Sequence, residues 1–184
     1  FALFQLASQH MTAKNTLSVG QLQTEYRTNP IGLDTPTPRL SWIINSSQRG
    51  TMQTAYQISA AASEQELKKG KAMLWNSGKI MSDQSAQVAY NGVMLKASQR
   101  VYWQVTIWDN KGQTTVSPIA WFETGLLSTN NWEAKWIEPQ IVEDPSKPYP
   151  SPFLRKSFSV DKTVKSARIY TTAKGLYLMS LNGQ

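Results

Sequence analysis

The chain of 184 residues contains no cysteine and a single histidine, His10. The absence of cysteine excludes a disulfide framework, a thiol nucleophile and a cysteine-ligated zinc or iron–sulfur site. A lone histidine near one end is a poor basis for a metal site or for a Ser–His–Asp triad. We therefore expect no metal and no cofactor, and we interpret His10 as a solvated residue of an N-terminal tail.

Long apolar runs and the common catalytic motifs are also missing. No stretch of about 18 apolar residues occurs, so the sequence predicts no membrane-spanning helix. Neither a G-x-S-x-G elbow nor a P-loop is present. Glycoside hydrolysis needs two converging carboxylates, but the adjacent pair Glu143 and Asp144 lies in a proline-rich stretch where neighbouring side chains point apart. The residues alone assign no catalytic side chain to this chain.

The formal net charge is +7, but the positive charge is unevenly distributed. From Lys147 onward the segment holds a single acid, Asp161, and carries nearly all of the excess. The remaining body of the chain is close to neutral. Because nucleic-acid binding needs a basic face on the folded domain, this distribution argues against a nucleic-acid partner.

Short strands separated by turn residues fill the segment 17–127. The alternation of apolar and polar side chains predicts strands in these stretches: 17–26, 39–44, 54–63, 74–85 in part, 87–90, 100–109 and 113–125. Pro118 makes the last of them an edge or bulged strand. Asn91-Gly92 predicts a hairpin turn, and Asp109 to Gly112 predicts a type I turn that ends in a left-handed glycine.

One short helix interrupts this pattern. Ser63 has the character of an N-cap, Glu66 occupies the capping-box position, and Gly70 ends the segment. A helix of two turns contributes little stability of its own. The sequence therefore predicts an all-β fold, an immunoglobulin- or fibronectin-III-like sandwich over residues 17–127.

The stretch RVYWQVTIWD carries apolar side chains on both faces of a strand. Trp103 on one face, together with Trp42 in an earlier strand, is expected to anchor the core between two sheets. Tyr102 and Trp108 lie on the opposite face, where a surface strand needs no aromatic residues. They are candidates either for packing against another domain or for stacking on a sugar ring.

The ends of the chain differ in character from the sandwich. Residues 1–16 are predicted to be a leader or the remnant of a secretory signal peptide, which would place the protein outside the cytoplasm, secreted or periplasmic. Residues 128–152 are rich in proline and predict a stiff linker. Residues 153–184 alternate again and stop just after Asn182-Gly183, a turn signal without a return strand. We expect them to be the incomplete start of a second β-domain.

Several stretches resemble the N-terminal part of bacterial α-L-rhamnosidases of the inverting glycoside hydrolase type. The resemblance rests on the combination of NPIGLDTPTPRLSW, WNSGK and WQVTIWD, and it continues through WEAKWIEP to the last residue. It implies an immunoglobulin-like domain, then a carbohydrate-binding-like jelly-roll domain, then an (α/α)₆ barrel with the catalytic acids. That barrel is not in this chain, so no catalytic residue is carried over. Val101 stands where a corner tyrosine is usual.

Two functions are consistent with these observations. In the first, the chain is the non-catalytic N-terminal part of an α-L-rhamnosidase and packs against downstream domains of the same polypeptide, with rhamnose-containing glycans as a further partner. In the second, it is a free-standing fibronectin-III-like carbohydrate-binding or adhesion module. Downstream sequence with helical periodicity and clustered carboxylates would favour the first.

Overall fold

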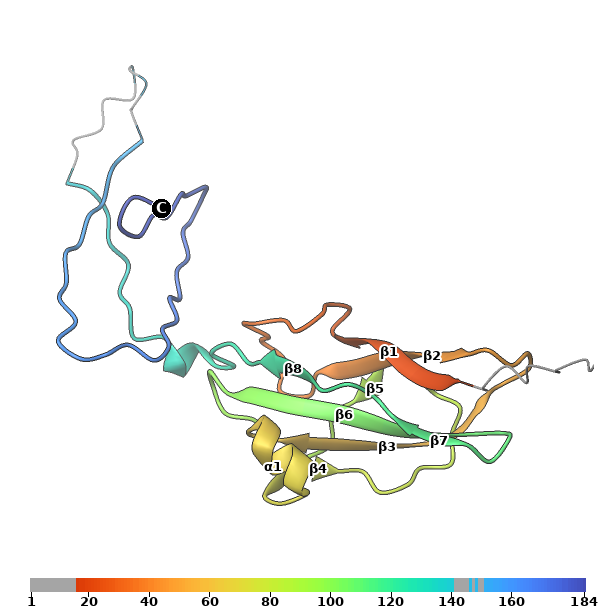
Figure 1. Ribbon diagram of the computed structural model, residues 1–184. Coiled ribbons are helices and arrows are strands. Elements are labelled where there is room, and N and C mark those ends of the chain that lie inside the picture. The colour runs from red at the N-terminus through yellow and green to blue at the C-terminus, as the bar shows by residue number, and fades with distance from the viewer. Residues whose placement is uncertain (1–15, 141–145, 147, 149–150) are drawn as a thin grey trace, which may run out of the picture. The chain divides into compact units, whose positions relative to one another are not determined.

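The computed structural model describes residues 16–140, 146, 148 and 151–184 (Figure 1). They divide into two compact units, one ending at Ala134 and the other running from Lys135 to Gln184. Every helix and strand within the described residues belongs to the first unit. The predicted leader, apart from Thr16, and the paired acids Glu143 and Asp144 lie outside the described residues.

The first sheet has three antiparallel strands in the order β1-β2-β5. They are β1 (Leu17–Thr24), β2 (Arg39–Ser46) and β5 (Val88–Ala89). β1 and β2 pair along most of their length, with a register shift between Gly20 and Gln23. The long connection from β1 to β2 holds three prolines and one glycine, which explains why no strand or helix forms there.

The second sheet is built around β6 (Arg100–Asp109), which pairs with strands on both of its edges. On one side lie β3 (Gln53–Ala61) and then β4 (Met73–Asn76); on the other lie β7 (Thr114–Val116) and β8 (Ala120–Glu123). β7 and β8 follow one another along the same edge of β6. Pro118 separates them because proline cannot donate a ladder hydrogen bond. The expected interruption of this edge strand is confirmed.

The hydrophobic core lies between the two sheets. Trp103 is fully buried, and Trp42 is nearly so. The indole N–H of Trp42 donates to Gln53 Oε1 at 2.9 Å, and its ring meets that of Tyr56 edge-on at 5.3 Å. This hydrogen bond satisfies the buried indole N–H of Trp42. The all-β sandwich predicted from the alternation is confirmed.

Helix α1 (Glu64–Lys69) follows β3 and forms as the sequence predicts. The hydroxyl of Ser63 accepts from the backbone N–H of Glu66 at 3.2 Å and donates to its carboxylate at 3.1 Å. Gly70 adopts a left-handed conformation with φ of 63° and ends the helix. Leu67 is its buried residue, and it fastens the helix to the sandwich.

The hairpin predicted at Asn91-Gly92 is wrong. β5 before this turn pairs with β2 in the first sheet, whereas the chain after it runs to β6 in the second sheet. Gly92 is needed for close packing instead, since a Cβ there would lie 2.5 Å from the carbonyl oxygen of Leu74. The turn at Asp109 to Gly112 forms as expected, with φ of 78° at Gly112.

The second unit contains no helix or strand within its described residues, so the strands expected from Phe153 onward are not formed in this structure. Strands need neighbours to complete their hydrogen-bond ladders, and no ladder links the described segments of this unit. Its apolar side chains stay open to solvent, with Phe153, Leu176 and Leu178 almost wholly exposed. A second β-domain starting near residue 153 stays a prediction.

Candidate functional site on the outer face of β6

The two faces of β6 have different surroundings. Side chains alternate strictly between buried and half-buried along its ten residues. Val101, Trp103 and Val105 point into the core, whereas Tyr102 and Trp108 lie on the outer face. The outer residues between them are Gln104 and Thr106, which are polar.

Tyr102 and Trp108 do not form one site. They stand six residues apart on one strand, which separates them by about 20 Å at roughly 3.3 Å per residue. A single sugar ring cannot contact both side chains. The sequence placed them on the same face, and the structure places them at opposite ends of that face.

Trp108 is partly covered by its own domain. The ammonium group of Lys79 lies 4.4 Å from the centroid of the indole ring, a cation–π contact. Ala55 of β3 and Thr114 of β7 stand directly beside Trp108 in the two ladders. A ligand that stacked on this face of the ring would first have to displace Lys79.

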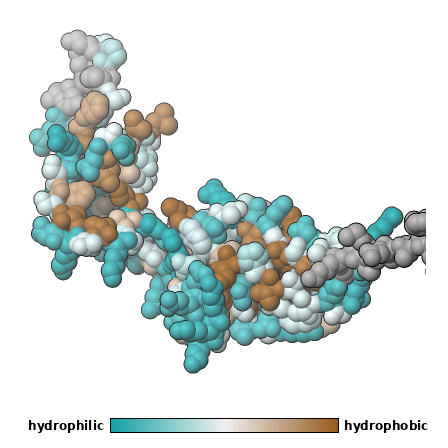
Figure 2. Space-filling model, in the orientation of Figure 1, coloured by the Kyte–Doolittle hydropathy of each residue, from teal (hydrophilic) through white to brown (hydrophobic). Residues whose placement is uncertain are grey.

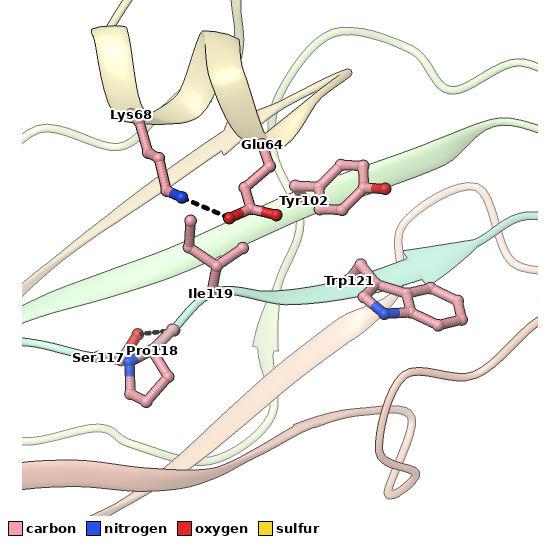
Figure 3. A pocket seen from close by; sticks show the side chains of 7 residues that line it. All are labelled: Glu64, Lys68, Tyr102, Ser117, Pro118, Ile119 and Trp121. Carbon is pink, nitrogen blue, oxygen red and sulfur yellow. Dashed lines mark hydrogen bonds and ion pairs between the residues drawn. The ribbon is translucent and has the colours of Figure 1, made fainter.

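Tyr102 lies beside an open groove at the other end of the face. Trp121 of β8 stands directly opposite Tyr102 in the ladder, so the two aromatic side chains are neighbours on the outer surface. The groove has a volume of about 390 Å³ (Figure 3). Its lining comes from α1, β6, the segment between β7 and β8, and β8 itself: Glu64, Lys68, Tyr102, Ser117, Pro118, Ile119 and Trp121.

Sequence reasoning missed Trp121, although the signal was present. In the stretch AWFE, Ala120 and Phe122 are the inward residues of an edge strand, and this alternation places Trp121 on the outer face. Pro118 indicates an interrupted strand. The residues after it still alternate between inward and outward side chains, and this alternation predicts the position of Trp121.

Several contacts fix the position of Trp121. The guanidinium carbon of Arg100 lies 4.0 Å from the centroid of the indole ring. Arg100 also forms an ion pair with Glu123, with 3.0 Å between Nη2 and Oε2. The backbone N–H of Trp121 donates to Asn29 Oδ1 at 3.0 Å. These contacts fix the backbone of Trp121 and place the guanidinium of Arg100 over one face of its indole.

Charged groups from α1 border the groove. Glu64 and Lys68 form an ion pair between residues one helical turn apart, and both are about half exposed. The hydroxyl of Ser117 already bonds the backbone N–H of Val105 at 3.0 Å and the carbonyl of Pro118 at 2.7 Å. In Figure 2, hydrophilic surface over α1 borders a hydrophobic patch. The groove can therefore offer stacking and hydrogen bonds to a small ligand.

This groove lacks a pair of catalytic carboxylates. Glu64 is the one carboxylate in its lining, and it is bound to Lys68. Among the described residues there is also no group of three or more His, Cys, Asp or Glu side chains that could hold a metal ion.

The connection between β1 and β2 holds the conspicuous NPIGLDTPTPRLSW stretch, and its role is structural. Leu33 donates its N–H to the carbonyl of Glu123 at 3.1 Å and accepts from the N–H of Gly125 at 2.6 Å. The carbonyl of Pro30 accepts from the N–H of Glu123 at 2.9 Å. This segment thereby covers the free edge of β8, which would otherwise expose unpaired backbone groups.

An ion pair closes the same connection. The guanidinium of Arg39 binds the carboxylate of Glu25, with 2.6 Å between Nη2 and Oε2, and the backbone N–H of Arg39 donates to the same group at 2.7 Å. The side-chain hydrogen bond from Arg39 lowers the pKa of Glu25, against the opposing effect of burial. The arginine of the PRLSW stretch thus fastens the beginning of the connection to its end.

The fold defines a class of protein: an immunoglobulin-like sandwich of two β-sheets. Residues 19–128 match the family described as "Rha78A-like, N-terminal immunoglobulin domain". The chain belongs to this family.

Relatives with this domain are much longer than the chain. An alpha-L-rhamnosidase of Formosa agariphila is 32% identical over 191 residues, covering 93% of this chain and 20% of the relative. One from Alteromonas sp. is 34% identical, covering 96% of this chain and 20% of the relative. The chain thus spans about a fifth of the length of the curated relatives it matches.

Two solved structures have the same fold. The alpha-L-rhamnosidase of Streptomyces avermitilis, solved with L-rhamnose, is 41% identical with a TM-score of 0.64, over 67% of this chain and 12% of its own. That of Dictyoglumus thermophilum is 34% identical with a TM-score of 0.64, over 67% of this chain and 14% of its own. Within the part of this chain that the structure describes, no helix is long and apolar enough to cross a membrane.

Proposed function

We propose that this chain is the non-catalytic N-terminal part of a longer α-L-rhamnosidase, in which the sandwich is an accessory module that packs against other domains. One observation carries this proposal. The chain matches the N-terminal immunoglobulin domain of such enzymes at residues 19–128 and covers about a fifth of its relatives' length. A free-standing adhesion module would not be expected to align with one part of enzymes five times as long.

The reaction belongs to the same proposal. The parent protein would hydrolyse terminal α-L-rhamnosides with inversion at the anomeric carbon, using a pair of carboxylates in a domain beyond this chain. We further propose that the parent is secreted or periplasmic. The apolar stretch FALFQLASQ with its small residues, typical of the end of a signal peptide, supports this location.

The connection between β1 and β2 offers a surface for packing. Tyr26 and Ile31 are 65% and 56% exposed, although the connection that carries them is pinned to β8 by the backbone hydrogen bonds described above. Exposed apolar side chains on a rigid support are typical of a contact surface. We assign this surface to a domain in the remaining four fifths of the parent's length.

The packing role can be tested with Ile31→Ser. In the 184-residue chain we expect a change in unfolding free energy within about 0.5 kcal/mol, because Ile31 is exposed there. In the full-length protein we expect a lower melting temperature, since a covered apolar side chain would be lost. Differential scanning fluorimetry of both proteins measures the difference.

Met94→Ser is the matched control, since Met94 is 86% exposed in another loop of the same unit. It should leave both proteins unchanged. Equal shifts for the two variants in the full-length protein would count against a packing surface at Ile31.

A further inference from the structure

We propose that the groove between α1, β6 and β8 binds a single pyranose ring (Figure 3). Its volume of about 390 Å³ falls in the range of about 300–1,000 Å³ that is typical of small-molecule sites. The site itself is argued from the sandwich alone. The choice of an α-L-rhamnoside as the probe rests on the proposed function.

The aromatic side of the groove matches the apolar face of a sugar. Pyranose rings present a face of C–H groups, which aromatic rings attract through their quadrupole. Tyr102 and Trp121 stand side by side on neighbouring strands, and Pro118 and Ile119 extend the apolar wall. Arg100 covers one face of the Trp121 indole and holds the ring in place, so the sugar would stack on the opposite face with little loss of conformational freedom.

The polar side of the groove matches the hydroxyl groups of the same ring. Glu64 and Lys68 project from α1 at its border. A carboxylate has about four acceptor positions and an ammonium three donors. Their one mutual bond therefore leaves both groups able to bind vicinal hydroxyls, and hydrogen bonds to charged groups are the stronger kind.

This mixture favours a sugar over a protein partner. The centres of protein interfaces are depleted of charged residues, whereas here an ion pair borders the same small groove as two aromatic side chains. A pyranose is both small and amphiphilic. Trp108 is not part of the site, because it lies about 20 Å away along the strand.

The test is a titration of the ¹⁵N-labelled 184-residue chain with methyl α-L-rhamnoside, followed by NMR of the backbone amides and the indole N–H groups. We expect saturable shifts at the Trp121 indole and in α1, with a dissociation constant on the order of millimolar. The Trp108 indole should not shift. The absence of any saturable shift in the folded chain would overturn the proposal.

Three variants locate the effect. Trp121→Ala should abolish the shifts in α1, and Glu64→Ala should weaken binding by at least about fivefold. Glu64 is half exposed on α1, so its variant stays informative even if Trp121→Ala unfolds. Trp108→Ala is the matched control and should bind like the parent chain. Binding that survives at full strength in Glu64→Ala and Trp121→Ala would contradict the assignment.

The outcome is separable from the proposed function. If the full-length protein hydrolyses rhamnosides but the groove residues show no saturable NMR shift with the rhamnoside, this inference alone is overturned. A groove that binds the rhamnoside in a protein whose full-length form lacks the activity supports the inference and overturns the proposed function. The groove residues could instead show no shift with sugar and become protected from hydrogen exchange only in the full-length protein. That result would overturn the inference and indicate that another domain docks on the groove.

Discussion

Tyr90 shows how one side chain joins the two sheets. It follows β5 in the first sheet, and its ring meets those of Trp75 and Phe122 of the second sheet edge-on at 5.2 and 6.4 Å. Its hydroxyl donates to the carbonyl of Val93 at 3.0 Å. This buried tyrosine bonds the backbone near its own position, whereas Val101, at the usual place of a corner tyrosine, points into the core.

Burial raises the pKa of Tyr90 to about 12. The folded state therefore favours the neutral phenol, and this contribution is complete below a pH of about 10, where the unfolded chain begins to ionise. Between about pH 10 and 12 the difference of two pKa units removes about 2–3 kcal/mol of stability. Urea unfolding at pH values from neutral to alkaline should show this decline.

Tyr90→Phe should weaken that decline, because it removes the group that ionises. At neutral pH it should lower the unfolding free energy by about 1 kcal/mol through loss of the hydrogen bond to Val93. Burial also raises the pKa of Tyr56, so part of the alkaline decline should persist in the variant. An identical pH dependence in both proteins would show that Tyr90 is not the responsible group.

At the scale of elements, patterns within short segments predict well. The alternation along β6 and the caps of α1 are determined by residues close together in the chain, and both form as expected. The backbone hydrogen bond between Leu33 and Gly125 joins residues far apart in sequence, so no pattern within a short segment predicts it. The same holds for the groove, because Tyr102 and Trp121 become neighbours only through the pairing of β6 with β8.

The connection between β1 and β2, which covers the free edge of β8, depends on Asn29. This residue has φ of 48°, and its side-chain oxygen accepts a hydrogen bond from the backbone N–H of Trp121. Asn29→Gly keeps the conformational freedom and loses the acceptor, so we expect a loss of about 1 kcal/mol in unfolding free energy. Asn29→Ala should lose about 1 kcal/mol more, because alanine is unfavourable at positive φ. Urea denaturation of the two variants separates these effects. An alanine variant as stable as the glycine variant would contradict this account of Asn29.

Across the whole molecule, the helices and strands of the described residues lie in the first unit, and the described residues of the second unit form none. The first unit ends at Ala134. Near its end, Leu127 packs on the core, and Asn131 Nδ2 donates a hydrogen bond to the carbonyl of Leu126 at 2.6 Å. The second unit leaves its apolar residues exposed. The strands predicted for the sandwich form because each finds a pairing partner within the first unit. The strands predicted after residue 153 would need pairing partners that the described residues do not provide.

We propose that this chain is a non-catalytic part of a longer α-L-rhamnosidase. The most direct measurement is the release of p-nitrophenol from p-nitrophenyl α-L-rhamnoside, with the purified 184-residue chain and the full-length protein of the same open reading frame compared at equal molar concentration. We expect hydrolysis by the full-length protein and a rate equal to the blank for the chain alone. Hydrolysis by the chain alone, or an inactive but folded full-length protein, would contradict the account.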